Sequence, residues 1–386
     1  MIVISDKTLC CGCTACVNAC PVQCIVMRRD KEGFDYPVAN PDMCIRCSKC
    51  EAVCPVLNQA SPRPSSASYA CRSEDMIEGS SSGGVFPILA RRLVDDGGVV
   101  FGAVMNEDMT VGHTEAVTYA EIDRMRGSRY VQSDLYAVYE DVRAYLQEGR
   151  KVMFTGVSCQ IAGLKSFLGK EREGLLTVEC ACHGAPSPGL WARYVDALQI
   201  SGGSKVVGVD FRDKSSGWRK YSFSYALENG SRVSRMHHDD PYMALFIQDM
   251  TLRPSCYRCP SRSGRSGSDI LLADMWNVEE AAPWMNDDKG ASLVVAYTTK
   301  GESALKSSGL DFMPVDEAVA KKRNAGFMES LKVPDHRAEF FSGLDSVRND
   351  SLISYMDGFV ERKTRLRALY ESWHSRLSRI KRKLTK

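Results

Sequence analysis

One cysteine spacing occurs twice near the amino terminus and constrains the fold more than any other feature of this 386-residue chain. The first copy reads C-x2-C-x2-C-x3-C-P from Cys10 to Pro21, and the second reads the same from Cys44 to Pro55, 34 residues later. A helical solenoid with a repeat of this length would need more copies and matching apolar positions, but only the cysteines are in register. The repeat therefore indicates a small paired module that positions thiols.

The spacing is typical of two [4Fe–4S] clusters. Three thiolates two residues apart can bind one cube, and the proline then directs the chain away so that the fourth thiolate serves the other cube. The predicted ligands of the first cluster are Cys10, Cys13, Cys16 and Cys54, and those of the second are Cys44, Cys47, Cys50 and Cys20. In this module the sequence resembles the two-cluster ferredoxins over about 55 residues.

Two other uses of these cysteines fit the pattern less well. A structural zinc ion needs only four ligands, usually supplied as two separated pairs, so two complete four-cysteine runs do not match it. Disulfides are favoured in short secreted chains, whereas the thiols of a cytosolic chain stay reduced. Cys11 and Cys24 lie outside the spacing and are expected to be small buried or half-exposed thiols.

The length and composition of the chain indicate a globular protein of two or three units. Hydrophobic residues make up 44% and charged residues 25%, close to the average of globular proteins. No apolar run reaches the ~18 residues that a membrane span requires. The first residues lack a basic segment followed by a long apolar one, so no signal peptide is expected. We therefore expect a cytoplasmic protein.

Apolar periodicity beyond the cysteine-rich module alternates between helix and strand. Helices are predicted over residues 84–95, 134–147 and 160–168, and strands over residues 97–105, 151–155, 222–227 and 292–298. This alternation favours an α/β or α+β body. The proline- and serine-rich residues 59–67 are typical of a linker between the module and the body.

Further cysteines in the body form a second candidate metal site. Cys159 lies at a predicted strand-to-helix turn, Cys182 follows Cys180 by two positions, and Cys256 and Cys259 form a C-x2-C pair. On their spacing alone, these cysteines could bind zinc, bind a cluster or bind nothing.

Several stretches of the body resemble the family of the coenzyme F420 hydrogenase/dehydrogenase beta subunit. The matching stretches, in the family's order, are Ser81-Ser82-Gly83-Gly84-Val85-Phe86, Arg126-Gly127-Ser128-Arg129-Tyr130-Val131-Gln132-Ser133, Gly156-Val157-Ser158-Cys159-Gln160, the run from Cys182 to Pro188, and Cys256 to Cys259 running on to Asp269-Ile270 and Asp274-Met275-Trp276. They span about residues 68–285, and a ferredoxin module in front is an arrangement that this family uses. Val157-Ser158 depart from the family's usual Thr-Pro, and Asn277 stands where glycine often follows.

The resemblance implies a flavoprotein with FAD beside a third [4Fe–4S] cluster. Carried over position by position, the ligands of this cluster are Cys159, Cys182, Cys256 and Cys259, and a register error of one residue would exchange Cys182 for Cys180. The implied fold class is α+β, with four parts. These are a bacterial-type two-[4Fe–4S] ferredoxin domain at residues 1–58, a linker at 59–67, a larger mixed α/β flavin and iron–sulfur domain at 68–340, and a helical basic tail at 341–386.

A flavin would need an unusual phosphate site, because the chain has neither G-x-G-x-x-G after a strand nor G-x4-G-K-[ST]. Ser80-Ser81-Ser82-Gly83-Gly84 before a predicted helix could offer hydroxyls, amides and the positive end of the helix dipole. A serine cap without any ligand fits the same residues. With the resemblance, the predicted flavin contacts are Ser81, Ser82, Gly83, Gly84, Arg126, Ser128, Tyr130, Gln132, Gly156 and Gln160.

Other polar residues of the body have plainer explanations. Lys214, Trp218 and Arg219 form a basic, aromatic stretch that could hold an anionic substrate tail, although a solvated charged turn is the commoner reason for such a stretch. His183 could donate a proton or shape the cluster pocket, and a structural role explains it equally well. The run from His237 to Asp240 is expected to be a loop.

The carboxyl-terminal residues 361–386 are strongly basic, with ten Lys and Arg against two Glu. Leu366, Leu369, Trp373, Leu377, Ile380 and Leu384 recur at helical steps and predict an amphipathic helix. Such a helix could contact an anionic membrane surface or a partner, or pack on its own body with the basic side outward. Nucleic-acid binding is not expected, because the remainder of the chain is acidic and has no recognition module.

The cysteine pattern and the resemblance together predict an oxidoreductase. Clusters carry single electrons, hydride carriers exchange electron pairs, and a flavin converts between the two. Electrons would pass, in either direction, between a one-electron carrier such as ferredoxin and a small-molecule hydride donor or acceptor. The alternative is a non-catalytic, ferredoxin-like electron-transfer subunit that docks to a partner enzyme. The sequence does not identify catalytic residues or the substrate.

Overall fold

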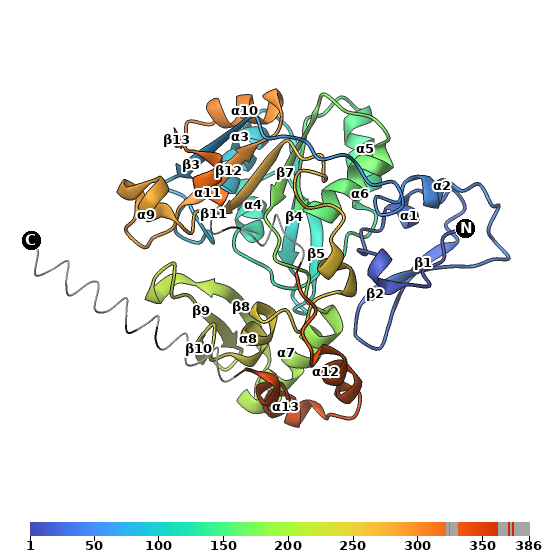
Figure 1. Ribbon diagram of the computed structural model, residues 1–386, viewed down its shortest axis with the longest axis vertical. Coiled ribbons are helices and arrows are strands. Elements are labelled where there is room, and N and C mark those ends of the chain that lie inside the picture. Colours follow the sequence, from blue (N-terminus) through green and yellow to red (C-terminus); the bar gives the residue numbers. More distant parts are fainter. Residues whose placement is uncertain (322–323, 325–330, 362–369, 371–372, 374–386) are drawn as a thin grey trace, which may run out of the picture.

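The computed structural model describes residues 1–321, 324, 331–361, 370 and 373. Figure 1 shows a small cysteine-rich lobe attached to the side of a larger body. Below, residues 1–58 are called the cysteine module, and the residues from the first body strand at Ala67 onward are called the body.

The cysteine module contains only short elements. They are η1 (Lys7–Leu9), α1 (Ala15–Asn18), β1 (Ile25–Arg29), β2 (Asp35–Ala39) and α2 (Lys49–Ala52), with β1 and β2 paired antiparallel. The repeat extends to the backbone, since Gly12 and Thr14 in the first copy and Arg46 and Ser48 in the second all have φ between 55° and 70°. This left-handed conformation curls the chain sharply, so both cysteine runs form similar tight loops.

An eight-stranded mixed sheet forms the centre of the body. Its strand order is β13-β3-β12-β11-β7-β6-β4-β5. The strands are β3 (Ala67–Arg72), β4 (Val99–Met105), β5 (Val111–Ala116), β6 (Val152–Val157), β7 (Leu175–Cys180), β11 (Ile270–Asp274), β12 (Ser292–Ala296) and β13 (Asp311–Pro314). The four central strands β11, β7, β6 and β4 are parallel, and the outer pairs are antiparallel. The predicted mixed body is confirmed.

Helices cover both faces of this sheet, as expected when parallel strands are buried. On one face, α3 (Val85–Asp95), α4 (Tyr119–Met125) and α10 (Thr299–Lys306) share an apolar core with the sheet. On the other face, α5 (Val138–Gln147) and α6 (Ser158–Leu168) do so. Ala15 of the cysteine module joins this second core, so the module is packed against α5 and α6 (Figure 1).

A second, antiparallel sheet lies beside the first and has the order β10-β9-β8. Its strands are β8 (Val206–Asp213), β9 (Ser222–Leu227) and β10 (Arg232–Met236), packed with α7 (Pro188–Gly202), α8 (Pro241–Ile247), α12 (Arg337–Leu344) and α13 (Leu352–Phe359). Trp191, Tyr194, Phe211, Phe223 and Tyr242 are fully buried at its centre. The remaining short elements are η2 (Lys214–Ser216), η3 (Pro254–Arg258), α9 (Val278–Ala281), η4 (Pro283–Met285), α11 (Glu317–Lys321) and η6 (Asn349–Ser351).

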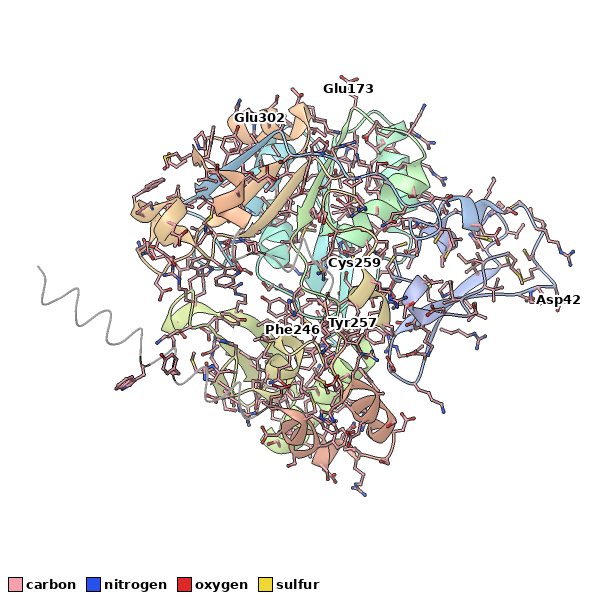
Figure 2. The ribbon with its side chains drawn as sticks, viewed as in Figure 1. Asp42, Glu173, Phe246, Tyr257, Cys259 and Glu302 are labelled. Carbon is pink, nitrogen blue, oxygen red and sulfur yellow. The ribbon has the colours of Figure 1, made fainter. Side chains whose placement is uncertain are left out.

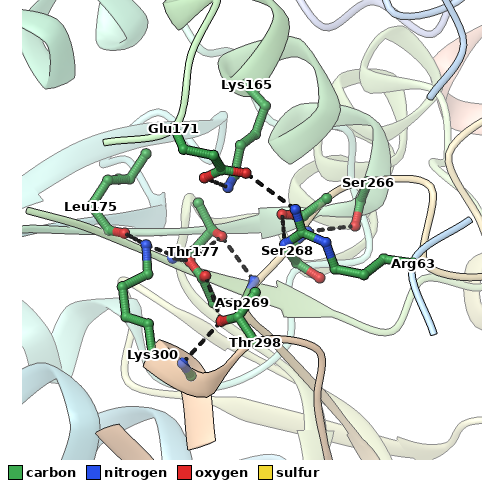
Figure 3. Close-up of polar contacts among 12 residues, drawn as sticks. Arg63, Lys165, Glu171, Leu175, Thr177, Ser266, Ser268, Asp269, Thr298 and Lys300 are labelled. Carbon is green, nitrogen blue, oxygen red and sulfur yellow. Dashed lines mark hydrogen bonds and ion pairs between the residues drawn. The ribbon is translucent and has the colours of Figure 1, made fainter. Parts of the chain in front are cut away.

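A buried carboxylate connects neighbouring strands of the large sheet (Figure 3). Asp269 is 1% exposed, accepts hydrogen bonds from the backbone N–H and hydroxyl of Thr177 at 2.8 Å each and from Thr298 Oγ1 at 2.8 Å, and pairs with Lys300 at 3.3 Å. An ion pair attaches the predicted linker to the body in the same region, since Arg63 of the linker pairs with Glu171 at 3.1 Å. Residues 59–66 therefore run along the body without forming a helix or strand.

Several predicted boundaries differ from the structure. The helix expected over residues 134–147 begins only at Val138. The strand expected over residues 151–155 continues to Val157, and the following helix begins at Ser158 rather than at residue 160. The strand at residues 222–227 is confirmed. The shifts matter at one place, since Cys159 lies within the first turn of α6.

Half of the basic tail predicted at residues 341–386 lies outside the described residues, namely residues 362–369, 371–372 and 374–386. Among the described residues, no helix is both long and apolar enough to cross a membrane.

The buried His113 predicts a pH dependence of stability. Its side chain in β5 is 5% exposed, Nε2 donates to the Thr155 carbonyl at 2.9 Å, and burial lowers its pKa from 6.5 to about 4. A lowered folded-state pKa means that the contribution is complete above pH 6.5 and is lost as pH falls toward 4. We expect His113 to account for about 1 kcal/mol of stability lost between pH 6.5 and 5.5, and about 3 kcal/mol by pH 4.

Urea unfolding of the wild type and of His113→Phe at pH 7.5 and 5.5 measures this loss. The His113→Phe variant should show a smaller loss, and the exposed His336→Phe should keep the wild-type loss. An unchanged pH dependence in His113→Phe would contradict the assignment.

Candidate functional site: two thiol sets and a cationic site

The first predicted cluster site is a cavity in the cysteine module. Cys10, Cys13, Cys16 and Cys54 all line it, together with apolar side chains that include Ile2, Ile4 and Met27. Burial, followed by repulsion from Cys10 and Cys54, raises the pKa of Cys16 to about 12. The structure therefore brings the four predicted ligands together, including Cys54 from the second cysteine run. This donor set fits a [4Fe–4S] cluster.

The second predicted set lies farther from the body. Cys44 and Cys20 are half-buried, Cys50 is buried and Cys47 is exposed. Cys24, which the spacing leaves over, is 5% exposed, and its sulfur lies 3.5 Å from that of Cys20. Figure 2 places Asp42, near this set, at the outer end of the module.

Four body cysteines form the third set. Cys159 lies on α6, Cys182 follows β7, Cys256 lies in η3 and Cys259 ends it. Burial, and then repulsion from Cys256 and Cys259, raises the pKa of Cys182. The pKa of Cys159 is raised first by its hydrogen bond to Cys11 and by burial, and repulsion from Cys259 and Cys182 adds to the rise. Cys180 ends β7, is exposed, and has no other cysteine among the groups that shift its pKa.

Within the described ranges, no three Cys, His, Asp or Glu side chains lie close enough to hold a single metal ion. A four-iron cube is larger than an ion and needs its thiolates farther apart, so the donor chemistry of the three sets suits clusters better than zinc.

Cys11 connects the module to the third set. It is 7% exposed, and hydrogen bonds from the thiols of Cys13 and Cys159 hold its pKa well below the usual value for cysteine. In the same contacts, the pKa values of Cys13 and Cys159 are raised by their bonds to Cys11. Cys11, Cys13 and Cys159 also pack in one core, so a predicted ligand of the first cluster and one of the third lie close to the boundary between the module and the body. Nothing in the local sequence indicates this contact, because the partner lies 148 positions away.

Two glycines allow this close approach. A Cβ on Gly163 of α6 would lie 2.9 Å from Cys13 Cβ and 3.0 Å from Cys13 Sγ. A Cβ on Gly12 would lie 2.6 Å from Gln132 Nε2. A side chain at either position would therefore force neighbouring atoms to move.

The predicted flavin loop is partly occupied by the protein itself. Ser82 Oγ donates to the Ala291 carbonyl at 2.8 Å, the Gly83 N–H donates to Ser292 Oγ at 2.9 Å, and Ser81 Oγ lies 2.8 Å from Ser128 Oγ. By contrast, Ser80 Oγ is buried and has no partner in the described part of the chain.

Four cations gather beside this loop, and together with Ser80 we call Arg126, Arg129, Arg212 and Lys214 the cationic site. Arg126 reaches the loop through the Met76 carbonyl at 3.1 Å, and Lys214 Nζ donates to the Ile77 carbonyl at 2.8 Å. Burial, and then repulsion from Arg212, lowers the pKa of Lys214 to about 8. Arg126 also contributes to this repulsion, so the cations share one electrostatic environment.

Arg212 has hydrogen-bonding capacity that the protein does not use. It is 5% exposed and donates from Nη1 to Asp274 at 2.6 Å, but Nε and Nη2 have no partner among the described residues. The Nε atoms of Arg126 and Arg129 are likewise buried without partners there. The Arg212 guanidinium lies over the rings of Tyr221, at 4.5 Å, and Trp276, at 5.3 Å. The negative charge of an anionic ligand with an aromatic ring would supply hydrogen-bond acceptors for these unpartnered N–H groups.

Other predicted contacts are used differently. Gln132 donates to the Cys11 carbonyl at 3.2 Å, and Gln160 donates to Ser133 Oγ at 2.8 Å and accepts from the Val157 N–H at 3.0 Å. Tyr130 stacks on Phe246, and Gly156 lies within β6. The hydrogen bonds of the two glutamine amides therefore do not support their expected role at a flavin.

The basic stretch also differs from its prediction. Trp218 is buried, and Arg219 pairs with Glu279 at 2.9 Å, so only Lys214 of the three named residues belongs to the cationic site. Arg212, Arg129 and Ser80 were missed as site residues, although each lies inside or beside a stretch with a predicted role. The imidazole of His183 lies 2.5 Å from Asp249 Oδ1.

The fold and the cysteine sets define an iron–sulfur protein with a small module on a mixed α/β body. Residues 9–58 match the family model described as 4Fe-4S dicluster domain. Residues 149–311 match the model for the carboxyl terminus of the coenzyme F420 hydrogenase/dehydrogenase beta subunit. The chain therefore has a 4Fe–4S dicluster domain followed by the carboxyl-terminal domain of the coenzyme F420 hydrogenase/dehydrogenase beta subunit family, which confirms the predicted resemblance.

Known ferredoxins are similar to the cysteine module. "Ferredoxin 7Fe" of Hydrogenibacillus schlegelii is 52% identical over 42 residues, 11% of this chain and 47% of its own length. "Ferredoxin" of Rickettsia felis is 36% identical over 76 residues, 20% of this chain and 65% of its own length. "Ferredoxin-1" of Caulobacter vibrioides is 41% identical over 54 residues, 14% of this chain and 43% of its own length. The chain spans about half to two thirds of the length of the first two relatives.

A solved structure is similar over a larger part of the chain. A chain of the F420-reducing [NiFe] hydrogenase complex from Methanosarcina barkeri is 18% identical, with a TM-score of 0.46, and the similarity covers 71% of this chain and 97% of that one.

The tight contact between α6 and the cysteine module predicts the effect of a single methyl group. Gly163→Ala should lower the free energy of unfolding by about 1–3 kcal/mol, because the new Cβ would overlap Cys13. Anaerobic urea unfolding of the cluster-loaded protein measures the change.

Gly358→Ala is the matched control, because Gly358 is exposed on α13 and a Cβ there would meet nothing within 4 Å. This variant should be neutral or slightly stabilised. Equal stability of both variants would show that the contact at Cys13 is not tight.

Proposed function

We propose that the chain is an iron–sulfur flavoprotein oxidoreductase that passes electrons between a one-electron carrier protein and a hydride-type small molecule. The observation that carries this proposal is the packing of Cys11 and Cys13 of the module with Cys159 of the body in one core, where Gly163 of α6 lets Cys13 approach closely. A ferredoxin module attached to a body without a redox role would not need its cysteines to pack against a cysteine of that body.

The proposed metal ligands follow from the three thiol sets. Two clusters would be held by the predicted ligands in the cysteine module, and a third by Cys159, Cys182, Cys256 and Cys259. We choose Cys182 over Cys180 because Cys256 and Cys259 act on its pKa, whereas no cysteine acts on that of Cys180. When bound, the clusters supply one-electron transfer.

The cationic site is the proposed position of the flavin, which would supply the conversion between single electrons and hydride. Unpartnered N–H groups of Arg126, Arg129 and Arg212 fit an anionic pyrophosphate, and Ser80 adds a free hydroxyl. The indole of Trp276, stacked on Trp218 with ring centroids 5.1 Å apart, offers an aromatic surface beside these cations. Arg212 already pairs with Asp274 and Arg126 with Asp123, so an anionic ligand would satisfy the remaining buried N–H groups of these arginines.

The choice of third-cluster ligand predicts a difference between two neighbouring cysteines. Cys182→Ser should lower the iron content of anaerobically reconstituted protein from about twelve to about eight per chain, since one four-iron cluster is lost. Cys180→Ser, the matched control, should keep about twelve. Iron loss from Cys180→Ser and not from Cys182→Ser would reverse the assignment.

Flavin content tests the cationic site and separates the enzyme from a non-catalytic carrier. Wild-type protein purified without oxygen should release about one FAD per chain on acid treatment. Arg212→Met should bind FAD roughly 10–100-fold more weakly, as expected for the loss of hydrogen bonds from a charged group, without changing the iron content. Arg219→Met, which removes an ion-paired arginine nearby, should keep its flavin.

Two results would overturn this part of the proposal. Protein with about eight irons and no flavin would be the non-catalytic electron-transfer subunit instead. Full flavin occupancy in Arg212→Met at submicromolar FAD would place the flavin elsewhere.

A further inference from the structure

Arg253 of the body reaches into the cysteine module. Arg253 immediately precedes η3, and its side chain is 1% exposed. Nε donates to the Cys10 carbonyl at 2.7 Å, and Nη2 donates to the Asp35 carbonyl at 2.9 Å. The guanidinium carbon lies 4.2 Å from the centre of the Tyr36 ring, so the group is enclosed by module atoms.

Among the residues that the structure describes, no carboxylate is a hydrogen-bond partner of Arg253. Besides the two main-chain carbonyls, Nη1 donates to the neutral amide oxygen of Gln132 at 3.1 Å. The guanidinium stays protonated in any folded protein, so a full positive charge is buried at this point. Its neighbour among the cluster ligands is Cys10, whose Sγ lies 3.7 Å from Nη2.

Within the module, this charge lies at the first cluster site, and in the body it also acts on Cys256 of the third set. Because the guanidinium is buried 3.7 Å from the Cys10 sulfur, it favours negative charge there. The corresponding position in the second cysteine run is Cys44, and the basic residues of that run, Arg46 and Lys49, are exposed to water. In a buried environment a charge acts far more strongly than in water.

We propose that Arg253 is the residue that sets the two clusters of the module apart: its buried charge makes the cluster held by Cys10 easier to reduce than it would otherwise be. The direction of electron flow in this inference rests on the proposed function. An electron that enters through the module would settle on the cluster nearest the body, because that cluster is the easier one to reduce. Reduction adds one electron from a one-electron donor protein, and no bond is made or broken.

A second buried arginine provides the matched control. Arg337 of α12 is 7% exposed and also links the body to the module, through Glu32 Oε1 at 3.1 Å and Glu32 Oε2 at 2.6 Å. Its charge is neutralised by that carboxylate, and no cysteine is among the groups that shift its pKa. Arg337→Met therefore removes a contact between module and body without removing a charge from the first cluster site.

Redox titration of the anaerobically reconstituted full chain, followed by electron paramagnetic resonance, tests the proposal. Arg253→Met should move the midpoint of one module cluster to a more negative potential and leave the other unchanged. Arg253→Lys should keep most of the wild-type value, and Arg337→Met should keep all midpoints. Unshifted potentials in Arg253→Met with intact iron content, or an equal shift in Arg337→Met, would overturn the proposal.

A second variant covers the case in which Arg253→Met does not fold. Gln132→Glu keeps the shape of the side chain and places a carboxylate against the Arg253 guanidinium, so the same midpoint should become more negative. An unchanged midpoint in this variant, with iron retained, would also overturn the proposal. Both titrations read the module clusters directly, so they give a result even if the protein contains neither flavin nor a third cluster.

Discussion

The close approach of α1 and α6 is the contact on which the other features of the molecule depend. Where Gly163 faces Cys13, the absence of a side chain lets a helix of the body touch a sulfur-bearing loop of the module. The same approach buries Cys11 between Cys13 and Cys159. Without it, the module and the body would each contain thiols, but those thiols would not share one core. Because electron transfer falls steeply with distance, this packing favours the electron path proposed above.

Charge is distributed in two contrasting ways around this contact. The thiol sets lie in surroundings where burial raises the pKa of Cys16 and Cys182, so binding of clusters there must release protons. The cationic site instead holds arginines with unused N–H groups and a lysine whose pKa is lowered. The first arrangement suits groups that bind as thiolates, and the second suits a ligand that brings its own negative charge. The two arrangements follow from the free-energy cost of burial, because a protein interior tolerates buried thiolates or buried cations only when a group of opposite charge balances them.

The sequence predicted those features that depend on spacing along the chain. The two cysteine runs and the alternating strands and helices follow from such patterns, and the structure reproduces them. It also places Cys54 in one cavity with Cys10, Cys13 and Cys16, whose roles as ligands stay predictions. Cys11 could not be predicted in the same way, because its partner Cys159 belongs to a helix of another part of the fold. The flavin contact predicted for Gln132 stays a prediction, because the hydrogen bonds of its amide to Cys11 and Arg253 depend on how the module docks. Arg212 lies two positions before Lys214, beside the stretch that was predicted to be basic, and only its burial distinguishes it from Arg219 of that stretch.

Docking also explains how a repeated sequence can give two unequal sites. Each cysteine run has the same spacing and has left-handed residues at the same two positions, so an isolated module would offer two nearly equivalent loops. In the part of the chain that the structure describes, Arg253, Gln132 and Gly163 of the body lie against the first loop and have no counterparts at the second. One site becomes buried and bears a neighbouring fixed charge, while the other keeps an exposed thiol at Cys47. Since the potential of a cluster depends on nearby charge and on solvent exposure, the asymmetry arises from long-range packing rather than from the ligands themselves.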